Sequence, residues 1–368
     1  MSRAADPIHI VEPRLVDDIG HCLSLVHAIA TAVADAGAAD RLTIWGGAGS
    51  AAFWRGPGQL RPVFQRRWRR LQSLTLLRRL LRDPGRILIS TAGTTDLALA
   101  AVASAGRTIS PNKLHLFVHW VGAKAGKAKL LERIARRQPN LRIFGPTPAV
   151  VDLFARCGFD ARLVPYPVEP VAEAPATGEA FRHLLVAGGA RIDKGLDHIA
   201  ALVDEMDARK MTLPITVQTS AEAQHARDDE VSRLLERLRG SGYRALELRA
   251  EAMAPDAYRA LFHGAIALQP YRAADFADRV SGVTLDALGA GAPVVATAGT
   301  WMARLIAAHG AGTAVADLGP ASLIEAIETV LADYAGFAAR ARVAAASVRK
   351  EHSARALIDA LLEGGEAA

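Results

Sequence analysis

The feature that most restricts the fold of this sequence is the alternation of short, β-rich apolar runs with longer amphipathic stretches. The amphipathic stretches include residues 22–36 and 128–137, and 353–362 reads as a final helix. Alternating strands and helices predict parallel sheets covered by helices on both faces, which is an α/β fold. The apolar runs are 8–11, 42–45, 87–90, 114–119, 142–144, 162–166, 183–188, 215–219, 245–248, 265–269 and 293–297.

A chain of 368 residues is too long for one ordinary hydrophobic core, so two domains are expected. The stretch "YPVEPVAEAPATGEA" at 166–180 contains three prolines, small residues and acids, which is a linker composition. We therefore predict an N-terminal Rossmann-like domain at 1–170 and a C-terminal one at 171–350. A C-terminal helix within 351–368 is expected to pack back on the N-terminal domain. Ligands of such sheets bind beyond the carboxyl ends of the strands, so the expected site is a cleft between the domains.

The net charge and the cysteine content indicate which kinds of partner and which cellular compartment suit this protein. The formal net charge of +6 favours an anionic partner such as a nucleotide, a nucleic acid or an anionic membrane surface. Two distant cysteines, Cys22 and Cys157, make no disulfide framework, which favours a reducing compartment. The N-terminus lacks a long apolar run, and no window approaches about 18 apolar residues. We therefore expect a cytoplasmic protein without a signal peptide or a transmembrane helix.

One glycine-rich stretch, "LTIWGGAGSAAF", has Gly47, Gly49 and Ala52 in the spacing of a dinucleotide fingerprint. It follows the second predicted strand instead of the first, and arginines stand where an acidic partner is needed. We interpret it as a tight turn at a strand end.

A second glycine-rich stretch, "VAGGARIDKGLDHI", has the features of an anion pocket. Gly188 and Gly189 end a strand and allow a ligand to approach the backbone, and Arg191 and Lys194 follow just before a helix. A planar guanidinium and a compact ammonium suit a diphosphate. The alternative is a glycine-rich turn with solvated charges.

The stretch "FADRVSGVTLDALGAGAPVVAT" at 276–297 has the features of a phosphate and sugar site. Ser281 suits the N-cap of a helix, and Gly282 lets a phosphate approach the first backbone N–H groups. Asp286, one turn into the helix, can accept hydrogen bonds from ribose hydroxyls, and Asp278 precedes the helix. The alternative is a plain helix whose acids favour its N-terminus.

Together, "ARIDKG" and "DRVSGVTLDALGAGAPVVAT" resemble glycosyltransferase family 4, the group 1 type with the GT-B fold. That family has an Arg…Lys-Gly pair, then two glutamates eight positions apart, then Ala-x-Gly-x-Pro-Val. The resemblance covers 181–312 and is weaker in the first half. It implies two Rossmann-like domains facing across a cleft, the first on the acceptor side and the second binding the donor.

The resemblance also implies roles for particular residues. Arg191 and Lys194 would bind the donor diphosphate, Asp286 the ribose and Asp278 the donor sugar. The family histidine near the reacting sugar would be His119. The implied catalytic residues are His119, Asp278, Arg191 and Lys194. The implied donor-binding residues are Gly20, Gly189, Arg191, Lys194, Ser281, Gly282, Val283, Thr284 and Asp286.

The function implied is transfer of a sugar from a UDP- or GDP-sugar to a glycan or lipid-linked acceptor, with retention at the anomeric carbon. Neither a metal nor another cofactor is implied, and the sequence has no Asp-x-Asp motif after a strand. Both family glutamates are aspartates here, and the first loop has a single glycine followed by His21. A non-catalytic nucleotide-sugar-binding protein and a sugar-nucleotide epimerase on this fold remain open alternatives.

A basic segment at Arg61–Arg82, "RPVFQRRWRRLQSLTLLRRLLR", has apolar residues at helical spacing among many arginines. One interpretation is an amphipathic helix on an anionic membrane that carries the acceptor. The other is a solvated helix packed on the core by its apolar stripe. Nucleic acid is not expected, because the segment lacks an aromatic platform and matches no nucleic-acid-binding module. The predicted apolar stripe consists of Phe64, Trp68, Leu71, Leu74 and Leu81.

Overall fold

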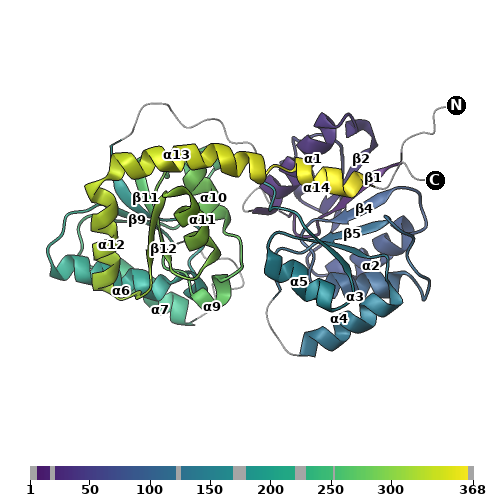
Figure 1. Cartoon of the computed structure of the whole chain (residues 1–368), viewed down its shortest axis with the longest axis horizontal. Helices are drawn as coiled ribbons and strands as arrows, with labels where there is room; N and C mark the ends of the chain where they lie inside the picture. The colour runs from purple at the N-terminus through teal and green to yellow at the C-terminus, as the bar shows by residue number, and fades with distance from the viewer. Residues whose placement is uncertain are drawn as a thin grey trace. The chain divides into compact units, whose positions relative to one another are not determined.

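The computed structural model describes residues 6–16, 21–121, 126–168, 180–219, 229–251 and 253–363. The chain forms two compact units, which we call unit 1 (residues 1–170 and 352–368) and unit 2 (residues 171–351). Each unit has a parallel sheet with helices on both faces (Figure 1), which confirms the predicted α/β fold class. In the part of the chain that the structure describes, no helix is long and apolar enough to cross a membrane.

Unit 1 has a seven-stranded parallel sheet in the order β3-β2-β1-β4-β5-β6-β7. The direction in which strands are added reverses between β1 and β4, which makes their carboxyl ends the topological switch point. The strands are β1 (Ile8–Val11), β2 (Leu42–Gly47), β3 (Gln59–Phe64), β4 (Arg86–Ile89), β5 (Leu114–Phe117), β6 (Arg142–Gly145) and β7 (Asp160–Leu163).

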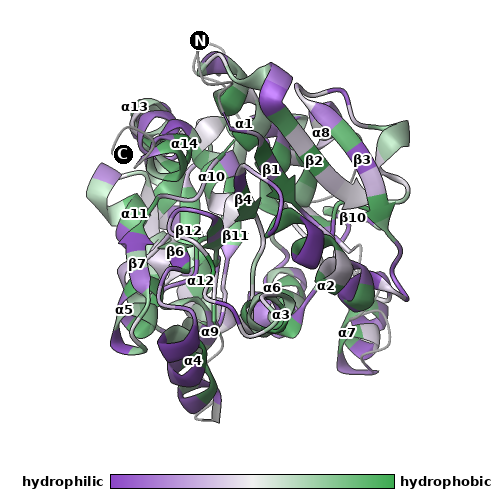
Figure 2. Ribbon diagram, turned by 90° about the vertical axis from the view of Figure 1, so that its right-hand side faces the viewer, coloured by the Kyte–Doolittle hydropathy of each residue, from purple (hydrophilic) through white to green (hydrophobic). Residues whose placement is uncertain are grey.

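Helices cover both faces of this sheet. On one face α1 (His21–Asp35) packs with α14 (Arg355–Leu362), and their apolar side chains share a core with Ile8 and Ile10 of β1. The four helices on the other face share a core with Val11 and Ile89. Because both faces are buried, the central strands are mainly apolar, as the predominantly green colouring of β1 and β4 in Figure 2 shows. The four helices are α2 (Arg69–Leu80), α3 (Thr94–Ala103), α4 (Gly126–Arg137) and α5 (Pro148–Arg156).

Unit 2 repeats this arrangement with a six-stranded parallel sheet in the order β10-β9-β8-β11-β12-β13. Its switch point lies between β8 and β11. The strands are β8 (His183–Val186), β9 (Ile215–Gln218), β10 (Leu246–Arg249), β11 (Ala265–Gln269), β12 (Val294–Thr297) and β13 (Gly312–Val315).

The helices of unit 2 also form two layers. On one face α6 (Leu196–Ala208) packs between α7 (Asp229–Arg239) and α12 (Pro320–Ala332). On the other face α13 (Tyr334–Glu351) packs along α10 and α11. The remaining bounds are α8 (Pro255–Ala260), α9 (Ala273–Phe276), α10 (Gly282–Gly289) and α11 (Trp301–His309), with short 3-10 turns at Ala39–Arg41, Ser50–Ala52 and Ile192–Lys194.

The prediction of one helix over Arg61–Arg82 is wrong. The first residues of this segment, up to Phe64, belong to strand β3, and α2 begins only at Arg69. Strand β3 lies at the edge of the sheet, where the missing N–H of Pro62 is tolerated.

The predicted apolar stripe of this segment is only partly correct. Phe64 is buried in the core, and Leu74 and Leu81 are partly buried against it. Trp68 and Leu71, in contrast, are 51% and 56% exposed. The buried residues of α2 are Ser73, Leu76, Leu77 and Leu80.

The glycine-rich stretch after the second strand forms a tight turn. Strand β2 ends at Gly47, whose N–H donates to the carbonyl of Leu15 at 2.8 Å. Only a single 3-10 turn, Ser50–Ala52, follows it. A dinucleotide fingerprint needs a longer helix at this point, so the turn interpretation holds.

Candidate functional site

The candidate donor residues of unit 2 lie at the carboxyl edge of its sheet, at the switch point between β8 and β11. Gly188 and Gly189 follow β8, while the chain after β11 leads through Tyr271 to the start of α10 at Gly282. Open α/β sheets bind ligands at this place. The two sequence motifs, which are about ninety residues apart, therefore end at one edge of one sheet.

The ammonium group of Lys194 lies close to both the end of β8 and the start of α10. Its Nζ lies 5.8 Å from the ring centroid of Tyr271. A Cβ built on Gly188, which has φ +89°, would lie 2.8 Å from Lys194 Nζ and 3.2 Å from Val283 Cγ2. The strand end, the ammonium group and the first turn of α10 therefore meet around Gly188, and a larger residue there would displace them.

Gly195 holds the turn that carries Lys194 against the chain after β11. It adopts φ +75°, and a Cβ at this position would lie 2.0 Å from the carbonyl oxygen of Pro270. The N–H of Arg272 donates to the carbonyl of Asp193 at 3.0 Å. The two segments on either side of the switch point are thus joined through their backbones.

Arg191 is buried, with 8% of its surface exposed, and forms a two-pronged ion pair with Asp193. Its Nε donates to Asp193 Oδ1 at 2.7 Å, and its second prong reaches Oδ2. Burial alone would raise the pKa of the Asp193 carboxyl, but hydrogen bonds from Arg191 and the charges of Arg191, Arg279 and Lys194 hold it below its usual range. Arg279, which the motifs did not indicate, reaches Asp193 Oδ2 at 3.4 Å.

The start of α10 is fixed by its cap. The Oγ of Ser281 accepts a hydrogen bond from the N–H of Thr284 at 3.4 Å, as predicted for an N-cap. The hydroxyl of Thr284 donates to Gln269 Oε1 at 2.7 Å, which ties the helix to β11. Because the cap engages the Thr284 N–H, the N–H groups of Gly282 and Val283 are the ones placed to meet an anion.

Asp286 is partly buried on α10 and receives a hydrogen bond from the hydroxyl of Tyr258 at 3.1 Å. Burial raises the pKa of its carboxyl to about 6, although the Tyr258 hydrogen bond and the charge of Arg259 oppose this rise. The sequence analysis missed Tyr258, which lies on the short helix α8. No spacing rule relates it to Asp286.

Asp278 lies at the surface, with 47% of its side chain exposed, and pairs with Arg304 of α11 at 2.8 Å. The same guanidinium donates to the carbonyl of Ala277 at 2.6 Å. Asp278 is therefore held beside the start of α11.

In unit 1 the candidate residue His119 follows β5 by two positions. Its Nε2 lies 2.9 Å from the carbonyl oxygen of Ser90, and because a carbonyl only accepts, Nε2 carries the hydrogen. The ring packs edge-on against Phe117 and Tyr166. The other candidate of this unit, Gly20, lies outside the described residues.

A fully buried carboxylate, Glu12, marks the switch point of unit 1 and was not indicated by the motifs. It follows β1 directly and accepts hydrogen bonds from the hydroxyls of Ser90 and Thr91, both at 2.7 Å, and from the N–H of Arg14 at 3.0 Å. Burial raises its pKa in spite of these hydrogen bonds. Glu12 and His119 thus contact the same residue, Ser90, one through its side chain and the other through its backbone.

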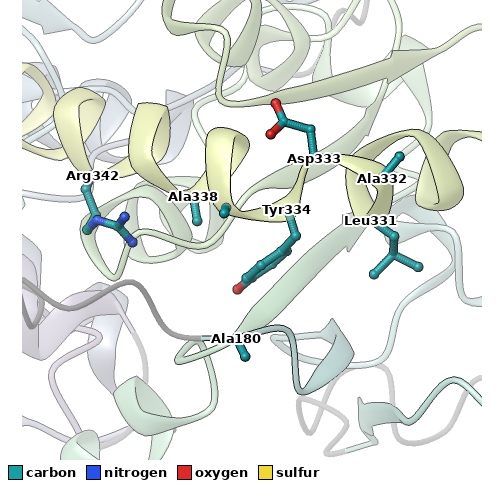
Figure 3. A pocket seen from close by; sticks show the side chains of 8 residues that line it. Ala180, Leu331, Ala332, Asp333, Tyr334, Ala338 and Arg342 are labelled. Atoms are coloured by element: carbon teal, nitrogen blue, oxygen red, sulfur yellow. The ribbon is translucent and has the colours of Figure 1, made fainter.

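A shallow pocket in unit 2 lies away from these residues (Figure 3). Tyr334 and Arg342 of α13 line it together with Ala180, which precedes β8. The hydroxyl of Tyr334 donates to the carbonyl of Ala265 at the start of β11, 3.3 Å away. The pocket therefore lies at the amino edge of the sheet, opposite to the candidate site. Among the described residues, no group of three or more His, Cys, Asp or Glu side chains is placed to hold a metal ion.

No protein-family model and no curated protein sequence matches this chain. Solved structures do. HepE of Anabaena, in complex with UDP and glucose, matches with a TM-score of 0.72 and 14% identity over 97% of this chain and 99% of its own. A glycosyltransferase of Rickettsia africae matches with a TM-score of 0.70 and 11% identity over 99% and 100% of the two chains.

WaaG, a glycosyltransferase involved in lipopolysaccharide biosynthesis, matches with a TM-score of 0.63 and 16% identity over 97% of this chain and 100% of its own. At these identities the likeness concerns the fold. The two parallel, Rossmann-like units of this chain thus have the GT-B fold that its motifs predicted.

Proposed function

We propose that this protein is a glycosyltransferase of the family 4 type, which moves a sugar from a UDP- or GDP-sugar to a glycan or lipid-linked acceptor. The observation that carries the proposal is the set of cations at the switch point of unit 2, beside the first turn of α10. Proteins with the same fold support a nucleotide-sugar donor, since HepE has been solved with UDP and glucose and with UDP-glucose.

The chemistry follows from the charges at this edge of unit 2. When a sugar leaves a nucleotide donor, negative charge develops on the departing diphosphate. Arg191 and Lys194, with the N–H groups of Gly282 and Val283, offer positive charge and hydrogen-bond donors that are fixed before the reaction. Such groups stabilise a departing diphosphate without a metal ion, and we propose a metal-independent transfer with retention.

Two carboxylates of unit 2 and one imidazole of unit 1 have proposed roles as well. Asp286 would accept hydrogen bonds from the ribose hydroxyls, held in place by Tyr258. Asp278 would contact the donor sugar. To do so it must break or share its exposed ion pair with Arg304. Exposed ion pairs of this kind contribute about 1 kcal/mol or less to the stability of the fold. His119, with its ring orientation set by Ser90, would contact the reacting sugar.

If the acceptor is linked to a lipid, the basic surface of unit 1 at the start of α2 would serve to bind the membrane that carries it. Trp68 and Leu71 are exposed beside the exposed arginines Arg66, Arg67 and Arg70. Aromatic and aliphatic side chains surrounded by arginines suit the interface of an anionic bilayer. We propose that this surface, at the start of α2, holds the protein on an anionic membrane.

The experiment that tests this function is a thermal-shift screen with UDP-, GDP- and ADP-sugars, followed by assays of the sugars that bind. A ligand at 100 times its dissociation constant stabilises the folded state by about 2.7 kcal/mol. We expect one sugar nucleotide to raise the melting temperature and to release its diphosphate when an acceptor is supplied. Conversion without an acceptor would indicate an epimerase. Binding without turnover across an acceptor panel would indicate a non-catalytic binding protein.

A further inference from the structure

His352 is a buried histidine that lies where the chain returns to unit 1 after α13, at the start of a stretch (residues 352–363) that we call the return segment. Its Nδ1 lies 2.9 Å from the carbonyl oxygen of Tyr166, and because a carbonyl only accepts, Nδ1 carries the hydrogen. The N–H of Val168 donates to the carbonyl of His352 at 2.9 Å. Two hydrogen bonds therefore join the return segment to the stretch that follows β7.

The side chain of Tyr166 lies against His119. The two ring centroids are 5.0 Å apart with 82° between the ring planes, so the rings meet edge to face. Phe117, the last residue of β5, lies 4.9 Å from the ring of His119 and 6.2 Å from that of Tyr166. The three rings form one cluster at the carboxyl end of β5, in the tilted and edge-on arrangements that aromatic pairs prefer.

This cluster bears on the orientation of the imidazole of His119. Its Nε2 is fixed by the carbonyl oxygen of Ser90, which determines the place of one ring atom. The torsion that sets the plane of a histidine ring has a broad energy profile, so the plane depends on the groups that pack against the ring. Phe117 and Tyr166 are two such groups, and they therefore help to set the plane of the imidazole.

Tyr166 in turn depends on the return segment. It lies outside the helices and strands, so no regular hydrogen-bond ladder fixes its backbone. The hydrogen bond from His352 holds its carbonyl, and its side chain packs against the core to which Leu357 and Ile358 of α14 belong. The return segment thus supports Tyr166 through its backbone and through its side chain.

We propose that Tyr166 and His352 are positioning residues for His119: His352 fixes the backbone of Tyr166, and the Tyr166 ring fixes the plane of the imidazole. That this imidazole contacts the reacting sugar rests on the proposed function. The family resemblance supplies the histidine at 119 but gives no role to Tyr166 or His352. His352 would thus act on the site from near the end of the chain, through a residue 186 positions earlier.

The first test follows the NMR signals of the His119 ring in the full chain without ligand, identified by their loss in His119→Gln. Tyr166→Leu should shift these signals, because the ring current of the tyrosine is lost. His352→Ala should shift them less, because the ring stays but its backbone loses a hydrogen bond. His352→Asn should return them to the wild-type positions, since the amide N–H of asparagine can replace Nδ1–H.

The matched control is Glu363→Gln, which breaks the exposed ion pair with Arg162 at the other end of the return segment. It should leave the His119 signals at their wild-type positions. Loss of one hydrogen bond should lower the melting temperature of His352→Ala by only about 2–4 °C, so this variant stays folded at room temperature. A variant that melts earlier but keeps the wild-type His119 signals would show a purely structural role and overturn the proposal.

The second test compares the rate of sugar transfer with the affinity for nucleoside diphosphate. Small displacements of reacting groups cost large factors in rate, so His352→Ala should lower kcat by about 5- to 50-fold. His352→Asn should recover most of this loss, and Glu363→Gln should transfer at the wild-type rate. Nucleoside-diphosphate affinity should stay within about 2-fold of the wild type in all three variants, because the proposed phosphate site lies in unit 2.

The two tests separate this inference from the proposed function. If the His119 signals respond to His352→Ala and are restored by His352→Asn, but the wild type transfers no sugar, only the proposed function is wrong. If the wild type transfers sugar while His352→Ala leaves kcat unchanged, only the positioning role is wrong. Unchanged His119 signals in a wild-type protein that also transfers no sugar would overturn both.

Discussion

The order of the first six strands and the position of the switch point are the same in the two units, yet an acidic side chain follows the first strand of one sheet and basic side chains follow the first strand of the other. In unit 1 the residue after β1 is Glu12, fully buried and hydrogen-bonded to the hydroxyls of Ser90 and Thr91. In unit 2 the segment after β8 contributes the buried Arg191 and the partly buried Lys194, and Lys194 lies beside the first turn of α10.

This difference shows that the shared fold sets the position at which a ligand can bind, whereas the side chains at that position determine which ligand is favoured. In unit 1 the buried carboxyl group of Glu12 already has three hydrogen-bond donors, so nothing about it requires a ligand. In unit 2 the side chains after β8 are two cations, and Lys194 lies beside the first turn of α10, an arrangement that favours an anion. A backbone topology that is shared over six strands therefore carries different side-chain chemistry in the two units.

The largest effect that we expect concerns the basic surface of unit 1, which we propose binds an anionic membrane. Each arginine near an anionic bilayer contributes about 1 kcal/mol, so replacing four of them by glutamine should weaken liposome binding by roughly two to three orders of magnitude. Nucleoside-diphosphate affinity should stay unchanged, because those cations lie in unit 2. Co-sedimentation with anionic liposomes at physiological salt measures the first quantity and calorimetry the second. The replaced residues are Arg66, Arg67, Arg69 and Arg70.

A control for this variant removes the same charge from unit 2. Four exposed arginines of α7 and the end of α6 serve this purpose, and their replacement should leave liposome binding within a few-fold of the wild type. Wild-type protein that ignores anionic liposomes would show that the basic surface has another purpose. The control residues are Arg209, Arg233, Arg237 and Arg239.

The second prediction concerns the ammonium group of Lys194. Lys194→Ala should weaken nucleoside-diphosphate binding by roughly 10- to 150-fold, because a hydrogen bond to a charged group contributes about 1.5–3 kcal/mol. Arg191→Ala should have a similar effect. Arg191→Lys should not restore it fully, since the two-pronged contact needs a planar group. Calorimetry at fixed salt measures each affinity. Unchanged affinity in both alanine variants would show that the positive edge of unit 2 is not the donor site.

Glu12→Gln is the control in unit 1 for the Lys194 and Arg191 variants of unit 2. Glutamine keeps the size of the side chain and still accepts hydrogen bonds. It should leave nucleoside-diphosphate affinity unchanged, because the negative edge of unit 1 has no part in binding the phosphates. A loss comparable to that of Lys194→Ala would remove the distinction between the two edges.

The third prediction concerns pH and Asp286. Its pKa is raised to about 6 in the folded state, so its charged form destabilises the fold. The penalty is small below about pH 4, grows as the pH rises towards 6 and then stays constant at up to about 3 kcal/mol. Asp286→Asn should therefore stabilise unit 2 at pH 7.5 and lose this advantage near pH 4. Thermal melts across this range measure the difference.

The same variant tests the proposed ribose contact. Asparagine accepts fewer and weaker hydrogen bonds than a carboxylate, so nucleotide binding should fall by a few-fold to about 10-fold while inorganic diphosphate is held as before. Equal losses for the two ligands would place Asp286 among the groups that act on the phosphates.

The smallest effect is expected for Asp278. Asp278→Asn weakens an exposed ion pair with Arg304, so its effect on stability should stay below about 1 kcal/mol. Nucleotide binding should be unchanged, while sugar transfer should be impaired because the proposed partner of Asp278 is the sugar. Initial rates at saturating donor, compared with calorimetric affinities, separate the two. A variant with full transfer activity would remove Asp278 from the proposed catalytic residues.

Much of the fold was readable from the sequence because its signals are local. A strand buried on both faces is mainly apolar, and a helix between two parallel strands is amphipathic, so the alternation alone predicted both sheets. The N-cap at Ser281 was also predicted correctly, because it depends on residues within one turn. The helix over Arg61–Arg82 was predicted wrongly, since helical spacing of apolar residues did not reveal that Pro62 lies on an edge strand.

The sequence by itself determined two parallel α/β sheets and the residues of the two motifs, including Arg191, Lys194 and Asp286. Only the tertiary structure placed Arg279 on Asp193, 86 positions away, and Tyr258 on Asp286. The physical reason is that periodicity reports which residues are buried, whereas the meeting of charged groups depends on strand order. In unit 2 that order puts the ends of β8 and β11 side by side, so the charges that follow them lie at one edge of one sheet.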